Sequence, residues 1–256
     1  IYVRWMDTGQ TARISQLERS PRGISWSPDG KWIAFSMLVP EKEPTIFKSP
    51  KKPKGAKWAD NAKVITRVKH ERDGSGYMEP GYSHLFVIPS EGGTPRQITS
   101  GNYQHRNGPQ WTPDSKQLIF SSNRSDNWDY EFYNSEIYSV SVADGTVKTL
   151  TDRNGPDRSP AISPDGKQIA FLSYENRTQT YQVTELYVMN IDGSGKRSLT
   201  ANLDRSASSP TWASDGSGVY FLYDDKGNTK IGLVDLNGNS KKVADNVGGT
   251  VIGRPY

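Results

Sequence analysis

The chain contains no cysteine and few histidines, and this limits its chemistry. Its 256 residues include 0 cysteines and 3 histidines, so disulfide bonds and zinc sites with cysteine ligands are excluded. Long apolar runs are also missing, since the mean hydropathy is −0.74 and no segment approaches the roughly 20 apolar residues of a membrane-spanning helix. Such a composition still allows a packed core, because half-buried strands alternate polar and apolar residues.

The histidines and the charge pattern argue against metal and nucleic-acid chemistry. His70, His84 and His105 have no second ligand at metal spacing, so we expect neither a metal nor another cofactor. The net charge is only +4, and five lysines cluster between residues 48 and 57. No aromatic platform interleaves with them, so we interpret the cluster as a solvated loop and expect no nucleic-acid partner.

What the chain does have is a repeated phrase. It reads as an apolar residue or Trp, then Ser-Pro-Asp-Gly, Lys and a short apolar run. Four copies begin at Trp26, Trp111, Ile162 and Trp212, and a degenerate one begins at Trp58. A second phrase, an apolar strand followed by an Asp-Gly or Gly-Gly turn and Leu/Ile-Thr, spans 85–99, 137–151 and 186–200, with weaker versions at 1–14 and 231–238. A self-similar period of this kind predicts a repeat fold.

The repeats predict an all-β protein. Asp-Gly and Asn-Gly supply the positive φ of hairpin turns, and the flanking Ile, Val, Tyr, Phe and Trp favour strands. Each full unit therefore contains four short strands, which is typical of a β-propeller built from four-stranded antiparallel blades. Counting a degenerate second phrase around 45–47, we expect about five full blades plus partial blades, as part of a seven-bladed ring. A closed six-bladed ring is the alternative.

Several further motifs resemble a known family. They include Gly55-Ala56-Lys57-Trp58, Arg72-Asp73-Gly74-Ser75-Gly76-Tyr77, His84-Leu85-Phe86-Val87-Ile88-Pro89, Gly92-Gly93-Thr94-Pro95-Arg96-Gln97-Ile98-Thr99, Gly248-Gly249-Thr250 and Arg254-Pro255-Tyr256. Together they resemble the N-terminal propeller of the prolyl oligopeptidase family of serine peptidases, on its acylaminoacyl-peptidase and dipeptidyl-aminopeptidase side. The resemblance implies that residues 1–256 are an incomplete propeller domain and that a catalytic α/β-hydrolase domain follows. The Gly-x-Ser-x-Gly elbow of that domain is absent here, so we expect no catalytic residue in this chain.

An arginine precedes each predicted inner strand. These residues are Arg19, Arg106, Arg158 and Arg205. One interpretation is a cationic rim at the mouth of the channel, where a substrate carboxylate or the hydrolase domain would bind. The other is a set of structural ion pairs between blades, with acidic neighbours such as Glu18, Asp157 and Asp204.

The segment 127–133 is the third candidate, because it places acidic and aromatic residues in a long connection between strands. Dipeptidyl-peptidase relatives use such a segment to bind a substrate's amino terminus. The resemblance therefore implies substrate contacts for Trp128, Tyr130 and Glu131, although Glu131 lacks the second glutamate that an ammonium-binding pair would use. Our candidate substrate-binding set is Trp128, Tyr130, Glu131, Arg106, Arg158 and Arg205.

These observations predict the substrate-gating propeller of a serine peptidase that cleaves short peptides. The expected partners are short peptides, the hydrolase domain of the same protein and, as a possibility, further copies of the chain, with no membrane span. The alternative is a non-enzymatic interaction propeller like the Tol-system periplasmic protein. A propeller lyase or glycan-binding protein would require clustered histidines or acidic residues. Relatives with this loop pattern are often exported, so we favour the bacterial periplasm over the cytoplasm.

Overall fold

The computed structural model describes residues 1–42, 50–59, 63–105 and 108–248. In these residues every regular element is a β-strand, and four antiparallel sheets have four strands each. Blade 1 contains β3 (Arg22–Trp26), β4 (Trp32–Pro40), β7 (Gly81–Pro89) and β8 (Arg96–Gln97). Blade 2 contains β9 (Gln110–Trp111), β10 (Gln117–Ser122), β11 (Glu136–Ser141) and β12 (Val147–Thr149). Blade 3 contains β13 (Arg158–Ile162), β14 (Gln168–Ser173), β15 (Glu185–Asn190) and β16 (Arg197–Ser198). Blade 4 contains β17 (Ala207–Trp212), β18 (Gly218–Asp225), β19 (Asn228–Asp235) and β20 (Ser240–Ala244).

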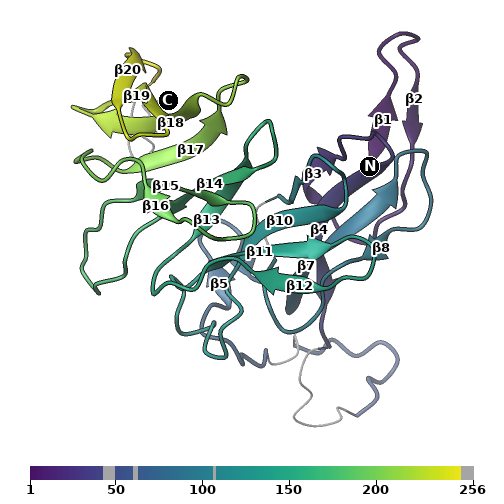
Figure 1. Cartoon of the computed structure of the whole chain (residues 1–256). Coiled ribbons are helices and arrows are strands. Elements are labelled where there is room, and N and C mark those ends of the chain that lie inside the picture. The colour runs from purple at the N-terminus through teal and green to yellow at the C-terminus, as the bar shows by residue number, and fades with distance from the viewer. Residues whose placement is uncertain (43–49, 60–62, 106–107, 249–256) are drawn as a thin grey trace.

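Two smaller sheets complete the described part of the chain. β1 (Tyr2–Arg4) pairs with β2 (Thr11–Arg13), and β5 (Glu71–Arg72) pairs with β6 (Gly76–Tyr77). Figure 1 shows the four blades following one another along an arc, from the β1–β2 hairpin at the N-terminal end to blade 4 in yellow and green. The prediction of an all-β fold made of four-stranded antiparallel blades is confirmed. No helix in the described residues is long and apolar enough to cross a bilayer.

The repeated Pro-Asp turns have the local chemistry that the sequence predicts. In the first copy the hydroxyl of Ser27 donates to the Asp29 carboxylate at 2.6 Å, and the backbone N–H of Lys31 donates to the same oxygen at 3.1 Å. The Ser27 hydroxyl also accepts from the N–H of Trp32 at 2.9 Å. The copies at 112–117 and 163–168 repeat these bonds. The side chains therefore fix each turn between the first two strands of a blade.

One predicted repeat unit is wrong. The Trp58 copy is not part of a blade: in the described residues 50–59 and 63–70 there is no strand, and β4 pairs directly with β7 over nine residues. Residues 41–80 are therefore an insertion between two neighbouring strands of blade 1, carrying the small β5–β6 hairpin. The degenerate phrase predicted around 45–47 lies outside the described residues. The described chain thus contains four full blades rather than five.

The first strand of each blade, which we call the inner strand, is irregular in three of the four blades, and in two of them a tryptophan contacts the preceding blade. Three of them show a register shift, and a residue with positive φ stands three positions before the last residue of each inner strand: Gly23, Gly108, Ser159 and Ser209. The indole N–H of Trp111 donates to the Ser25 carbonyl of the preceding blade at 3.2 Å, and that of Trp212 donates to Ala161 at 2.9 Å. Among the described residues no inner strand precedes β3, and Trp26 is 50% exposed.

The hydrophobic core lies between the blades. One buried cluster joins blades 1 and 2, a second joins blades 2 and 3, and a third joins blades 3 and 4. A fourth packs the outer face of blade 1 against the β1–β2 hairpin. In each blade the second strand places a fully buried phenylalanine in this core: Phe35, Phe120, Phe171 and Phe221. Face-to-face packing therefore holds the blades together and leaves the connections between strands free to carry function.

Candidate functional site

The candidate site lies at the end of blade 1 from which the insertion emerges, and residues between 67 and 79 of the insertion line it. A cavity of about 820 Å³ opens between the β5–β6 hairpin, the start of β3, the middle of β4 and the segments that lead into blades 1 and 2. Its charged lining consists of Arg19, Arg22, Arg67, Arg72 and Glu79. Met37, Leu38, Tyr77 and Met78 add apolar surface. We call this the arginine cavity.

Two of its arginines are held by carboxylates. The Nε of Arg19 donates to Oε2 of Glu79 at 3.0 Å, and the neighbouring Nη2 donates to Oε1 of the same residue. This bidentate contact raises the pKa of Arg19 and lowers that of the Glu79 carboxyl. Arg67 donates to Oε2 of Glu41 and to the carbonyl of Gly81, both at 2.9 Å. Both guanidinium groups are therefore fixed in position.

A second, smaller hollow lies on the other side of the same hairpin. Its volume is about 520 Å³, and it shares Arg67, Tyr77, Met78 and Glu79 with the arginine cavity. Lys63 lies over the ring of Tyr77, with its Nζ 3.8 Å from the ring centroid. The two hollows thus form neighbouring basic compartments separated by the β5–β6 hairpin.

Trp128, a predicted substrate residue, packs against this insertion. It lies in the connection between β10 and β11, half-buried, with its ring edge-on to Tyr82 at a centroid separation of 6.0 Å. The Arg67 guanidinium stands over both rings, 4.2 Å from Tyr82 and 5.8 Å from Trp128. The backbone N–H of Val68 donates to the Asp129 carboxylate at 2.8 Å. The segment 127–133 therefore supports the wall of the arginine cavity, next to the lining residues.

The other two residues of this segment face solvent. Tyr130 is 75% exposed, and Glu131 is also exposed. The backbone holds them: the N–H of Tyr130 and the N–H of Glu131 both donate to the Asn127 carbonyl, and the Glu131 carbonyl accepts from the Asn123 amide. The turn thus presents both side chains outward from the connection between β10 and β11.

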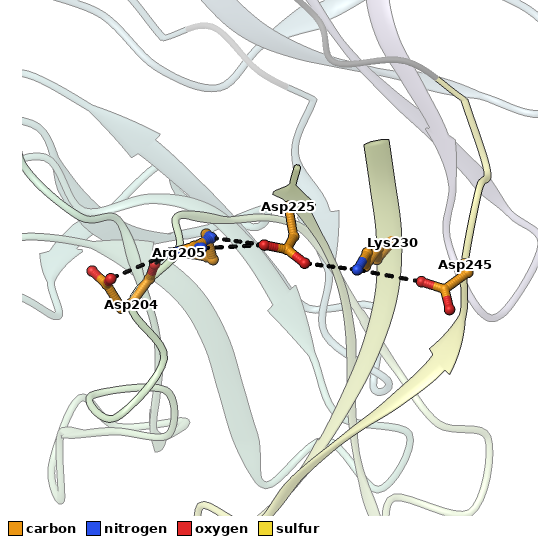
Figure 2. Close-up of polar contacts among 5 residues, drawn as sticks. All are labelled: Asp204, Arg205, Asp225, Lys230 and Asp245. Atoms are coloured by element: carbon orange, nitrogen blue, oxygen red, sulfur yellow. Dashed lines mark hydrogen bonds and ion pairs between the residues drawn. The ribbon is translucent and has the colours of Figure 1, made fainter. Parts of the chain in front are cut away.

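The predicted arginines have different surroundings. Arg158, the first residue of β13, donates to the hydroxyl of Thr184 at 3.2 Å. Arg106 lies outside the described residues. Arg205 belongs to a chain of alternating charges in blade 4 (Figure 2), where it donates to Asp225 at 3.1 Å and to Asp204 at 3.2 Å.

The chain of charges continues beyond Arg205. Lys230 donates to Asp225 at 2.7 Å and lies 3.5 Å from a carboxylate oxygen of Asp245. Hydrogen bonding to Lys230 and Arg205 lowers the pKa of the Asp225 carboxyl. Because Arg205 is already shared between two carboxylates of its own blade, the structural interpretation of this arginine is favoured, with ion pairs within a blade rather than between blades.

Sequence reasoning missed a set of titratable residues between the blades. His84 is the first residue of the buried run in β7 and His105 precedes β9, and their ring centroids are 5.2 Å apart. At the equivalent positions of the next two blades stand Glu136 and Asp157. The pairs share two contacts: the N–H of the residue after His84 or Glu136 donates to a threonine hydroxyl, and the N–H of His105 or Asp157 donates to a serine carbonyl. We call the two pairs the inter-blade pairs. Aligning the repeats on these positions would have found them.

The histidine pair is held neutral. His105 is fully buried, its Nε2 lies 2.9 Å from Nη1 of Arg124, and its Nδ1 lies 3.1 Å from the Ser83 carbonyl. Since a guanidinium only donates, Nε2 accepts and the proton sits on Nδ1. Burial lowers the pKa of His105 to about 3, with a further contribution from His84, and lowers the pKa of His84 to about 4, with a contribution from Arg124. The Nε2 lone pair of His105 is therefore occupied by the Arg124 guanidinium.

The carboxyl pair is shifted in the opposite direction. Burial raises the pKa of Glu136 to about 7, and the neighbouring Asp157 adds to the rise. Asp157 is fully buried, neither of its carboxyl oxygens has a hydrogen-bond partner in the described structure, and burial raises its pKa as well. Burial therefore makes both groups harder to ionise than exposed carboxyls.

Fold and sequence together identify the class of this protein as a β-propeller domain. Residues 49–181 match the family described as the dipeptidyl peptidase IV (DPP IV) N-terminal region, and residues 128–250 match the TolB beta propeller domain. The first match covers just over half of the chain. The chain belongs to the DPP IV N-terminal region family, and its resemblance to the N-terminal propellers of prolyl-oligopeptidase-family peptidases is confirmed.

Individual relatives support this assignment. The chain is 29% identical to dipeptidyl-peptidase 5 of Porphyromonas gingivalis over 129 residues, which are 49% of this chain and 19% of that protein. It is 24% identical to the uncharacterized peptidase YuxL of Bacillus subtilis over 255 residues, which are 93% of this chain and 37% of that protein. The chain therefore spans well under half of the length of these two peptidases.

Solved structures show the same fold. The Pyrococcus horikoshii acylaminoacyl peptidase superposes with a TM-score of 0.68 at 17% identity, over 95% of this chain and 35% of that chain. TolB from Acinetobacter baumannii superposes with a TM-score of 0.60 at 18% identity, over 96% of this chain and 49% of that chain. At these identities the superpositions establish the propeller architecture alone.

Proposed function

We propose that this chain is the substrate-gating propeller domain of a serine peptidase that cleaves short peptides. The observation that carries the proposal is the arginine cavity, built by an insertion between two strands of blade 1 in a chain of the DPP IV N-terminal family. Its volume of about 820 Å³ suits a small ligand. A site of this size would receive a short peptide and exclude a folded protein.

The chemistry would belong to the α/β-hydrolase domain that we propose to follow this chain. There a serine would attack the peptide carbonyl, a histidine would move the proton and an oxyanion hole would hold the developing charge. This chain would contribute orientation and selection of the peptide. Tyr130 and Glu131 are our candidates for contacts with the peptide, and Trp128 is a residue that positions the cavity wall.

The test uses the full-length protein that contains this chain. Release of a chromophore from short aminoacyl and acylaminoacyl substrates is measured with and without a serine-directed phosphonate, beside the 256-residue chain alone. Turnover that the phosphonate abolishes, with no turnover by the chain alone, supports the proposal. No turnover on any of these substrates and no phosphonate adduct by mass spectrometry would refute it.

A paired substitution tests the contact residues. Glu131→Gln should raise KM for substrates with a free amino terminus and leave KM for acylated substrates unchanged, because only the former present an ammonium group. Glu175→Gln is the matched control, since Glu175 is an exposed glutamate in the corresponding connection of the next blade. Equal effects on both substrate classes would show that Glu131 makes no contact with the ammonium.

The second candidate is a non-enzymatic interaction propeller. The observation that favours it is the match of residues 128–250 to the TolB beta propeller domain. That match is also the reason why we propose the bacterial periplasm as the compartment. A stable complex of the full-length protein with another periplasmic protein, together with inertness toward the phosphonate, would decide for this candidate.

A further inference from the structure

The arginine cavity has a strong excess of positive charge. Its lining includes four arginines and one glutamate, and the adjoining hollow adds Lys42, Lys63 and Lys69 together with Glu41. Like charges gathered around one hollow repel each other unless an anion enters it. The whole chain has a net charge of only +4, so this concentration of charge is a local feature.

Two of the four guanidinium groups have no partner among the residues that the structure describes. Arg19 is neutralised by Glu79 and Arg67 by Glu41. For the side chains of Arg22 and Arg72, by contrast, the described structure contains neither a hydrogen bond nor an ion pair. They come from different elements, the first residue of β3 and the last residue of β5, and line the same cavity. Within the described structure, the guanidinium groups of Arg22 and Arg72 are therefore available as hydrogen-bond donors on two walls of the cavity.

A guanidinium fork matches a carboxylate in shape and charge. It donates two parallel N–H bonds to the two carboxylate oxygens, and such charge-assisted bonds are about twice as strong as neutral ones. The apolar surface of Met37, Leu38 and Tyr77 lies beside these forks. Carboxylates attached to a short, partly apolar chain fit this combination, whereas a ligand that consists only of charge would leave the apolar wall unused.

We propose that the arginine cavity binds the carboxylates of short acidic peptides, with Arg22 and Arg72 as the direct ligands. Arg19 and Arg67, paired with Glu79 and Glu41, form fixed polar walls on either side of these ligands. This inference rests on the proposed function and refines it, because it assigns acidic peptides as the preferred substrate class.

The test measures binding separately from turnover. The full-length protein, treated with the phosphonate, is titrated by calorimetry with acetyl-Ala-Glu-Glu-Ala and with acetyl-Ala-Gln-Gln-Ala amide. We expect the acidic peptide to bind at least tenfold more tightly, with an affinity that falls as salt rises. The free-acid and amide forms of each peptide separate a C-terminal carboxylate from a side-chain carboxylate as the bound group.

Substitutions then locate the site. Arg22→Gln and Arg72→Gln should each weaken binding of the acidic peptide about tenfold, which is the size expected for one charge-assisted contact. The double variant should lose the preference for the acidic peptide. Arg22→Lys and Arg72→Lys keep the charge without the fork and should weaken binding less. Arg177→Gln is the matched control, because Arg177 is an exposed arginine on the connection after β14 that pairs with Glu175.

Two results would overturn the inference. One is equal binding of the acidic peptide and the glutamine peptide amide. The other is a folded double variant, verified by circular dichroism, that binds the acidic peptide as tightly as the parent protein. Inertness toward the phosphonate would refute the peptidase proposal alone, because calorimetry reports binding whether or not the protein catalyses hydrolysis.

Discussion

The two inter-blade pairs should make the stability of the chain depend on pH in opposite ways. Burial raises the pKa of Glu136 from its ordinary 4.5 to about 7. The stabilisation that this group contributes is therefore fully present below pH 4.5 and is lost as the pH rises through 7. The pKa of His84 falls from 6.5 to about 4, so its contribution is present above pH 6.5 and is lost as the pH falls toward 4. Between about pH 4.5 and 6.5 the two effects oppose each other.

The substitution Glu136→Gln separates the pH effect of Glu136 from that of His84, because the glutamine amide has nearly the same shape as the carboxyl group and cannot ionise. A rise in the pKa from 4.5 to about 7 corresponds to at most about 3 kcal/mol. Glu136 is only partly buried, so solvent screening reduces this to about 1–2 kcal/mol. Relative to the parent chain, the variant should gain this amount of stability between pH 5 and pH 8.

The assay is urea unfolding followed by tryptophan fluorescence at pH 5, 6, 7 and 8, with the free energy of unfolding compared at each pH. Glu185→Gln is the matched control: Glu185 is the first residue of β15, the position equivalent to Glu136 in β11, and Ala207 replaces the second carboxyl there. Because no second carboxyl stands there, Glu185→Gln should change the free energy of unfolding less than Glu136→Gln does. If Glu136→Gln shifts the free energy of unfolding equally at pH 5 and pH 8, Glu136 is not protonated in the folded chain and the reasoning is wrong.

Two further substitutions test the contacts between blades. Gly23→Ala should destabilise the chain by about 2–4 kcal/mol, because the φ of Gly23 is +60° and a Cβ there would lie 2.3 Å from the backbone of the segment leading into blade 2. Gly30→Ala is the control: Gly30 has φ +72° and open space around it, so this change should cost only about 1 kcal/mol. Equal losses of stability in thermal unfolding would contradict the close approach at Gly23. Trp111→Phe should cost about 1–3 kcal/mol because it removes the indole hydrogen bond to the preceding blade and part of the buried ring in the core between blades 1 and 2. Trp26→Phe, at a 50% exposed position, should change the denaturation midpoint little.

The sequence predicted the parts of this fold that local chemistry encodes. The Ser27–Asp29 turn and its copies close through side-chain bonds to backbone two residues away, so the phrase that forms the turn is visible in the chain itself. The strands on either side follow from their apolar residues. The turns and strands together give four-stranded blades, and they were sufficient to indicate the family.

Local sequence similarity gave a wrong prediction at Trp58, where we expected a repeat unit to begin. Trp58-Ala59-Asp60 resembles the start of a repeat, yet β4 pairs with β7 on either side of it. Nine paired residues across a buried sheet outweigh a weak resemblance in a connecting segment. Nothing in the local sequence states which of two possible partners a strand will choose.

The candidate site also depended on tertiary structure. Arg22 and Arg72 are 50 positions apart in the chain, and only the folding of the insertion back over blade 1 makes them walls of one cavity. His84 and His105 meet for a similar reason, since they belong to neighbouring blades that share a core. The sequence by itself determined the repeating unit, because a turn depends on residues next to each other. Only the tertiary structure decided which side chains meet, because those contacts depend on how whole sheets pack.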